Sequence, residues 1–186
     1  MEIRPIRPAD LDRLIDIDGT IESASYLHVE SVGEGLAMSW KLEERPLREK
    51  RIERNRPTDD MLFMMKQIAT GVEEGVALLA EHEQVNVATL IAKLEPEYQT
   101  LHALDVRVDF EHRRQGLGSA MVYQVIAEAR NRDLRAVSAH TRTDNFPAAQ
   151  FFAKCGFDLA GLDIRRHTNH DLVKESATLF WYASLD

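Results

Sequence analysis

The segment Arg113-Arg114-Gln115-Gly116-Leu117-Gly118 has the composition of an anion-binding loop. It lies between an alternating apolar stretch, Leu101–Val108, and a long amphipathic stretch, Leu117–Arg132. The first N–H groups of a helix lack intrahelical acceptors and carry partial positive charge, so a tight loop before a helix can hold phosphate oxygens. Glycines allow close approach of the ligand, and two arginines add positive charge. The loop is therefore a candidate anion site.

The loop lacks the features of the best-known nucleotide motifs. No Gly-Lys-Ser/Thr closes it, as a P-loop requires, and the third glycine of the dinucleotide pattern is missing. A Gly-x-Gly pair alone often only ends a strand, which is the ordinary alternative. If the loop does bind an anion, a nucleotide ligand other than ATP or NAD fits it better.

Length, charge and cysteine content restrict the class of protein. The 186 residues, 44% of them apolar, suffice for one well-buried domain, and we expect a single domain over residues 1–186. One cysteine, Cys155, excludes an internal disulfide framework and a cysteine-ligated metal. No signal core or apolar span is recognisable, so we expect a cytoplasmic protein. The net charge of -8 disfavours nucleic-acid and membrane partners and suits a cationic substrate, although acidity also serves solubility alone.

Hydrophobic periodicity predicts strands with helices inserted between them, which gives a mixed α/β sheet with helices on both faces. The segment 18–56 has mixed signals, and its charge-dense part, Glu43–Arg56, could be a helix or a solvated loop. The predicted strands are Ile3–Arg7, Gly75–Ala80, Val85–Leu94, Leu101–Val108, Arg135–His140, Phe157–Arg166 and Ala177–Ala183, and the predicted helices are Asp10–Ile17, Thr58–Thr70, Leu117–Arg132 and Asn145–Cys155.

A second motif follows the loop: Asn145, Ala148 and Phe152, then Lys154 and Gly156-Phe157. Together, Arg-x-x-Gly-x-Gly and Asn-x-x-Ala-x-x-x-aromatic-x-Lys-x-Gly-Phe resemble the GNAT superfamily of acetyl-CoA-dependent N-acetyltransferases. The pattern is most similar to streptothricin acetyltransferases, because it extends to the C-terminal segments. The resemblance implies the GNAT fold, a mixed, mostly antiparallel twisted sheet with a splayed central strand pair and helices on both faces.

The resemblance also implies acetyl-CoA as cosubstrate and no metal. Val106 and Val108 would line the pantetheine arm and pair with its amides as though the arm were an added strand. The ordinary alternative is that both valines are core residues. Seven residues would surround the diphosphate through backbone N–H groups at the helix start: Arg113, Arg114, Gln115, Gly116, Leu117, Gly118 and Ser119.

Three residues of the second motif would lie beside the pantetheine arm near the thioester: Asn145, Ala148 and Phe152. For Asn145 we expect both this contact and a helix-cap role, whereas Phe152 could be an ordinary core aromatic. Many family members have tyrosine at the position of Phe152, where it protonates the leaving thiolate. A thiolate with a cysteine-like pKa of about 8.5 can also take its proton from water. Tyr98, Tyr123 and Tyr182 are alternative hydroxyl groups.

Acetyl transfer to an amine requires loss of a proton, because a lysine-like ammonium has a pKa of about 10.4. His102 is the first candidate base, since GNAT enzymes often place a carboxylate or histidine there and imidazole titrates in the useful range. A structural, hydrogen-bonded histidine is the alternative. Asp105 is the second candidate, but strand alternation places it on the opposite face unless a bulge intervenes.

The acceptor implied by the resemblance is a primary amine on a small cationic molecule, streptothricin-like or aminoglycoside-like. A protein N-terminal or lysine acetyltransferase and a non-catalytic acetyl-CoA-binding regulator remain alternatives, and a homodimer stays open. Acidic residues that could attract the amine are Asp18, Glu22, Glu30, Glu34 and Glu175, and aromatic residues that could wall a pocket, or lie in a core or dimer interface, are Tyr26, Trp40 and Trp181.

Overall fold

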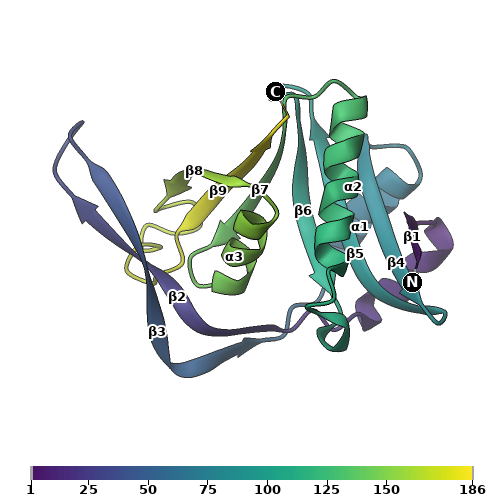
Figure 1. The fold of residues 1–186 in the computed structure, drawn as a ribbon, viewed down its shortest axis with the longest axis horizontal. Coiled ribbons are helices and arrows are strands. Elements are labelled where there is room, and N and C mark those ends of the chain that lie inside the picture. The colour runs from purple at the N-terminus through teal and green to yellow at the C-terminus, as the bar shows by residue number, and fades with distance from the viewer. Residues whose placement is uncertain (1, 186) are drawn as a thin grey trace. The chain divides into compact units, whose positions relative to one another are not determined.

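The structure is a computed structural model that describes residues 2–185. The chain forms two compact units, one built from Met1–Thr20, Arg54–Ala139 and Tyr182–Asp186 and the other from Ile21–Glu53 and His140–Trp181. Figure 1 shows the helices and strands of both. No helix among residues 2–185 is long and apolar enough to cross a membrane.

The first unit is built on a sheet with the strand order β1-β4-β5-β6-β7. Pairs β1/β4, β4/β5 and β5/β6 are antiparallel, and β6/β7 is parallel. A two-residue turn at Glu83 and Gln84, both with positive φ, joins β4 to β5 and confirms the predicted hairpin. The strands are β1 (Glu2–Pro5), β4 (Gly75–His82), β5 (Val85–Glu95), β6 (Thr100–Val108) and β7 (Ala136–Arg142), of which β7 continues into the second unit.

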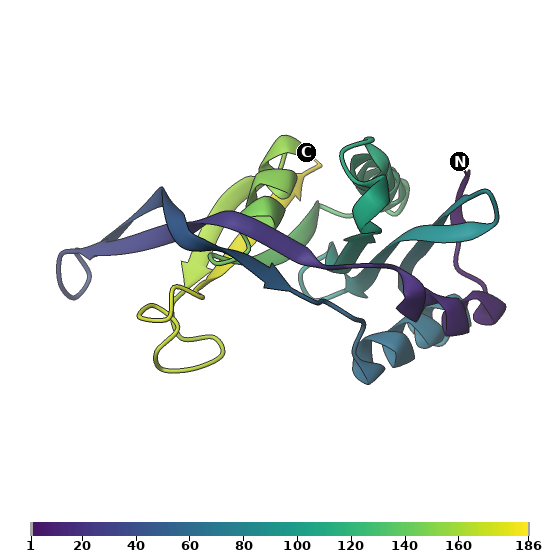
Figure 2. The same cartoon turned by 90° about the horizontal axis from the view of Figure 1, so that it is seen from below.

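Helices cover both faces of this sheet, as predicted. In Figure 2, η1 (Pro8–Asp16) and α1 (Asp59–Ala69) lie on one side and α2 (Leu117–Asn131) lies on the other. Thr58 caps α1 by accepting a hydrogen bond from the Met61 amide at 3.2 Å. The buried cluster between η1, α1 and the sheet contains Ile6, Leu14, Ile17, Met65, Ile68, Ala77, Leu79 and Ile91.

The second unit contains a long antiparallel hairpin, β2 (Ile21–Val32) with β3 (Ser39–Glu53). It also contains the end of β7, followed in sheet order by β9 (Thr178–Ser184), whose residues up to Trp181 belong to this unit, and by β8 (Asp158–Asp163), and it contains the helix α3 (Phe146–Lys154). Gly156 ends α3 with φ 85°, as the C-cap prediction requires.

The expectation of helix or loop over Glu43–Arg56 is wrong, because β3 runs through this segment to Glu53. Glutamate, which is frequent in this segment, and lysine are depleted in strands by propensity. The segment is a strand because of its partner strand: Glu30 faces Lys41 across the hairpin, and Lys50 forms an ion pair with Glu22. Such pairing joins residues far apart in the sequence, so local patterns do not reveal it.

Candidate active site

Unpaired backbone amides lie at the start of α2. Within residues 2–185, no backbone or side-chain acceptor takes the amides of Gln115, Gly116, Leu117 and Gly118, and the first helical hydrogen bond is from Ala120 to the Gly116 carbonyl at 2.9 Å. Gly116 has φ 82°, which a residue with a side chain rarely adopts. A run of free amides at a helix start fits the diphosphate of acetyl-CoA.

The two arginines of the loop have different surroundings. The Arg113 guanidinium donates to the carbonyls of Val108 at 2.9 Å and Thr20 at 2.5 Å, so it fixes the loop to the end of β6. Arg114 is exposed and has φ 60°. Arg114 is therefore the arginine whose charge is available to a ligand. Leu117 is buried, and Ser119 is half-buried.

One edge of β6 lacks a strand partner over its second half. The parallel register between β6 and β7 covers Thr100–Ala103 with Ala136–Ala139 and goes no further. From Asp105 to Val108, the described pairing of β6 is with β5 alone. Val106 and Val108 lie in this stretch, so main-chain groups there, other than the Val108 carbonyl that accepts from Arg113, are available to the amides of an extended ligand. The predicted splay of the central strand pair requires such an unpaired edge on β6.

His102 lies on the paired part of β6 and is buried. Its Nδ1 is 2.9 Å from the Oγ of Ser138, its register partner on β7. This hydrogen bond fixes the orientation of the ring, which both a structural role and a base role require.

Strand β6 contains a bulge between His102 and Asp105, which is the condition under which the two side chains can share a face. Ile91 pairs with Asp105 whereas Ala92 pairs with Ala103, so Leu104 is an extra residue. Because directly paired residues share a face, His102 opposite Lys93 and Asp105 opposite Ile91 point to the same face of the sheet.

Asp105 has a close cationic neighbour, which its sequence position did not indicate. Its carboxylate is 3.3 Å from the guanidinium of Arg107, whose side chain is 3% exposed. Arg107 also donates to the Asn55 carbonyl at 2.6 Å. The Asp105 carboxylate is therefore already engaged in an ion pair with a buried side chain, and His102 remains the first candidate base.

The other three predicted ligand contacts belong to the second unit. Asn145 caps α3, as predicted, by accepting from the Ala148 amide at 3.3 Å, and both residues are half-buried. Phe152 is buried, with its ring centre 5.1 Å from that of Phe157. Phe152 is therefore a core residue, which was the expected alternative. Its contact with the pantetheine arm stays a prediction.

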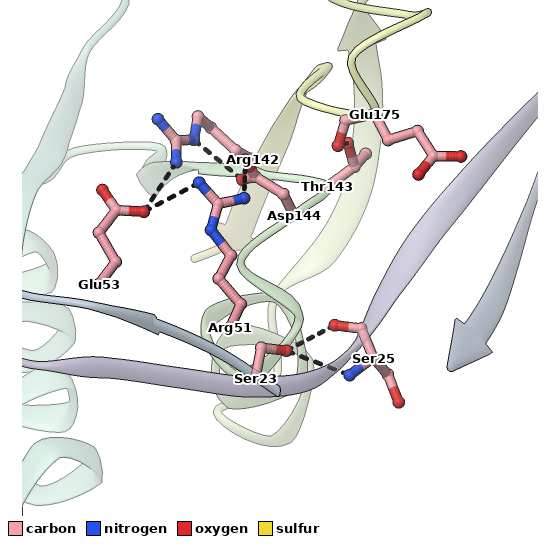
Figure 3. Close-up of polar contacts among 8 residues, drawn as sticks. All are labelled: Ser23, Ser25, Arg51, Glu53, Arg142, Thr143, Asp144 and Glu175. Carbon is pink, nitrogen blue, oxygen red and sulfur yellow. Dashed lines mark hydrogen bonds and ion pairs between the residues drawn. The ribbon is translucent and has the colours of Figure 1, made fainter. Parts of the chain in front are cut away.

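A charged network precedes Asn145, and sequence reasoning missed it. Asp144 accepts from Arg51 at 2.6 Å and from Arg142 at 2.9 Å, and Glu53 lies 3.0 Å from Arg51, as Figure 3 shows. Burial alone would lower the pKa of Arg51, but the bonds to Asp144 and Glu53 raise it. The network fixes the start of α3 to β3. No local signal could indicate it, because Arg51 and Asp144 are 93 positions apart.

Two of the remaining predicted residues have clear surroundings. Trp181 is buried and donates through Nε1 to the Thr141 hydroxyl at 2.8 Å, so it is a core residue. Trp40, near the hairpin tip, is 43% exposed. Among residues 2–185, no three histidine, cysteine, aspartate or glutamate side chains gather in a metal-binding arrangement.

Comparison with known proteins places these features in a family. The sequence profile of the Acetyltransferase (GNAT) family matches residues 38–157. Streptothricin acetyltransferase of Escherichia coli is 31% identical over 75 residues, which are 40% of this chain and 43% of that protein. The chain therefore matches less than half the length of this curated relative.

Two solved structures match over the whole chain. Nourseothricin acetyltransferase has a TM-score of 0.79 at 20% identity, with 100% of this chain and 98% of that one covered. A Bacillus anthracis protein assigned as a streptothricin acetyltransferase, solved in complex with acetyl coenzyme A, has a TM-score of 0.74 at 18% identity and the same coverage. At these identities the likeness shows the fold, and it confirms the predicted GNAT fold.

Proposed function

Because the chain belongs to the GNAT family of acetyltransferases, we propose that it transfers an acetyl group from acetyl-CoA to a primary amine of a small cationic acceptor. The observation that carries the proposal is the run of unpaired amides from Gln115 to Gly118 at the start of α2. The names of the matched relatives and the net charge of -8 support a cationic, streptothricin-like or aminoglycoside-like acceptor.

The residues of the first unit then have distinct tasks. The amides at the start of α2 hold the diphosphate, and Arg114 adds positive charge beside them. Arg113 keeps the loop in place through the carbonyls of Val108 and Thr20. The unpaired edge of β6 around Val106 and Val108 exchanges hydrogen bonds with the amides of the pantetheine arm.

Acetyl-CoA supplies an activated acyl group to the acceptor amine. The acceptor ammonium first loses one proton, which we assign to His102, directly or through a water molecule, with the ring orientation set by Ser138. The neutral amine then attacks, a new N–C bond forms as the C–S bond breaks, and the nitrogen releases its second proton to water. Phe152 carries no proton to give, so the thiolate takes its proton from water or from another hydroxyl group.

Phe152 is also the observation that favours the rival function, a regulator that binds acetyl-CoA without turnover. The composition supports a cytoplasmic protein without nucleic-acid or membrane partners, working as a monomer or homodimer, and these remain proposals.

Release of free CoA thiol tests the proposal. Purified protein with acetyl-CoA is offered nourseothricin, an aminoglycoside, 1,5-diaminopentane, pentylamine and a lysine-containing peptide. We expect turnover with at least one small cationic amine and little with the peptide. Turnover confined to the peptide would favour a protein acetyltransferase. Calorimetric acetyl-CoA binding without turnover on any amine would favour the regulator.

A further inference from the structure

We propose that Glu175, together with Tyr26 and His28, binds a second cationic group of the acceptor, an alkylammonium or guanidinium that is not itself acetylated. The proposal rests on the proposed function, because it names what else the acceptor must carry. All three residues belong to the second unit, two on β2 and one on the segment before β9.

The three side chains form one cluster. Tyr26 and His28 are two positions apart on β2, which places them on the same face, and their ring centres are 6.4 Å apart. The carboxylate Oε1 of Glu175 lies 3.2 Å from the Nδ1 of His28. In Figure 3 the Glu175 side chain extends from its backbone near Thr143 toward the β2 ribbon.

The backbone of Glu175 is held in a conformation that disfavours its side chain. Its φ is 55°, in the left-handed region where a glycine would fit at lower cost. The buried Thr143 hydroxyl donates to the Glu175 carbonyl at 2.7 Å and helps to fix this geometry. Left-handed residues with side chains are concentrated at functional sites, so a glutamate at this position requires an explanation.

The carboxylate is accessible and is not neutralised by a strong base. The Glu175 side chain is 37% exposed, and within residues 2–185 its ion pair is with His28, which is charged only when protonated. The nearby Arg45 guanidinium lies 3.2 Å from Glu43, which provides it with a carboxylate of its own. Desolvation raises the pKa of the Tyr26 hydroxyl and the Glu175 carboxylate raises it further, whereas the Arg45 guanidinium offsets only part of the increase. The cluster is therefore a negative site beside an aromatic ring.

A carboxylate beside a tyrosine ring suits an organic cation. The carboxylate accepts charge-assisted hydrogen bonds from ammonium or guanidinium N–H groups, and the ring face adds a cation–π contact. The bound group cannot be the amine that reacts, because an adjacent carboxylate stabilises the ammonium form and the reacting amine must be neutral. Glu175 therefore selects acceptors that have a second cation.

Steady-state kinetics of Glu175→Gln test the site. With 1,5-diaminopentane or nourseothricin as acceptor, we expect the acceptor KM to rise at least about 10-fold, while kcat and the KM for acetyl-CoA change less than about threefold. Glu44→Gln is the matched control, since it removes the same charge from the hairpin at a position that pairs with Leu27 on the opposite face. An unchanged acceptor KM, or an equal rise in Glu44→Gln, would overturn the proposal.

A second variant separates recognition from a merely structural role. Glu175→Gly relieves the backbone conformation, so we expect the same rise in acceptor KM with no fall in melting temperature. If Glu175 served only the fold, the melting temperature would fall and KM would not change.

A binding measurement tests the second-cation site independently of the proposed function. If no amine is turned over, the proposed function fails, but an NMR titration with 1,5-diaminopentane still reports on Tyr26 and His28. We expect saturable shifts of their resonances in the wild type and a loss of saturation in Glu175→Gln. Equal, saturable shifts in both proteins would refute the second-cation site, whatever the result for the proposed function.

Discussion

Replacing Gly118 by tryptophan is expected to weaken acetyl-CoA binding at least about 100-fold, which corresponds to about 2.7 kcal/mol. Gly118 is the second residue of α2, and its amide is one of the four without a protein acceptor. An indole here occupies the space where the diphosphate must approach, and each lost charge-assisted hydrogen bond is worth about 1.5–3 kcal/mol. Isothermal titration calorimetry measures the change directly.

The control for this experiment is Ala127→Trp. Ala127 is an exposed residue of the same helix, nine positions and about 14 Å beyond Gly118, and the variant should bind acetyl-CoA like the wild type. Because Gly118 is buried, circular dichroism and urea unfolding must show that its variant is folded, and Gly118→Ala provides a milder step with an intermediate affinity. Undiminished affinity in folded Gly118→Trp would refute the loop assignment.

Replacing His102 by alanine is expected to lower kcat/KM for the acceptor by about 10²–10⁴-fold at pH 7, the usual worth of a general base. The loss should shrink as the pH approaches the pKa of the acceptor ammonium, about 10.4 if it resembles lysine, because neutral amine then forms without assistance. The measurement is the pH profile of CoA-thiol release for the wild type and the variant.

His102→Gln separates the base role from the structural role. Its amide can keep a hydrogen bond with the Ser138 hydroxyl, which lies 2.9 Å from the imidazole, but it does not titrate near neutral pH. If His102 is the base, glutamine does not restore activity at pH 7. Restored activity, or a pH profile of the alanine variant parallel to that of the wild type, would show that the histidine serves only the fold.

Features encoded by neighbouring residues could be predicted from the sequence. Thr58 begins α1, Asn145 begins α3, and the positive-φ pair Glu83 and Gln84 joins β4 to β5. Each depends on a cap or turn whose chemistry lies within a few residues, so the local pattern is sufficient. The same holds for the tight turn before α2, whose glycines and following amphipathic helix are contiguous.

Features that depend on distant partners could not be predicted. Strand β3 is a strand because β2 pairs with it, whereas its own residues favour a helix or a solvated segment. The bulge at Leu104 exists only in the register with β5, and it is what turns Asp105 to the face of His102. The role of Arg113 likewise depends on the Thr20 carbonyl, 93 positions away.

The structure also changes how the loop charges are understood. Two adjacent arginines are equivalent in the sequence, but Arg113 is bound to backbone carbonyls and Arg114 is exposed. An arginine that fixes a loop contributes to affinity by keeping the amides in place, and an exposed one contributes by its charge. The two should therefore differ in how strongly salt screens their contribution.

The most direct test of the central claim is a ¹⁵N NMR titration of the wild type with acetyl-CoA. If the start of α2 holds the diphosphate, the amide resonances of Gln115, Gly116, Leu117 and Gly118 shift downfield and saturate together with binding. Saturation by acetyl-CoA with those four resonances unmoved would contradict the account.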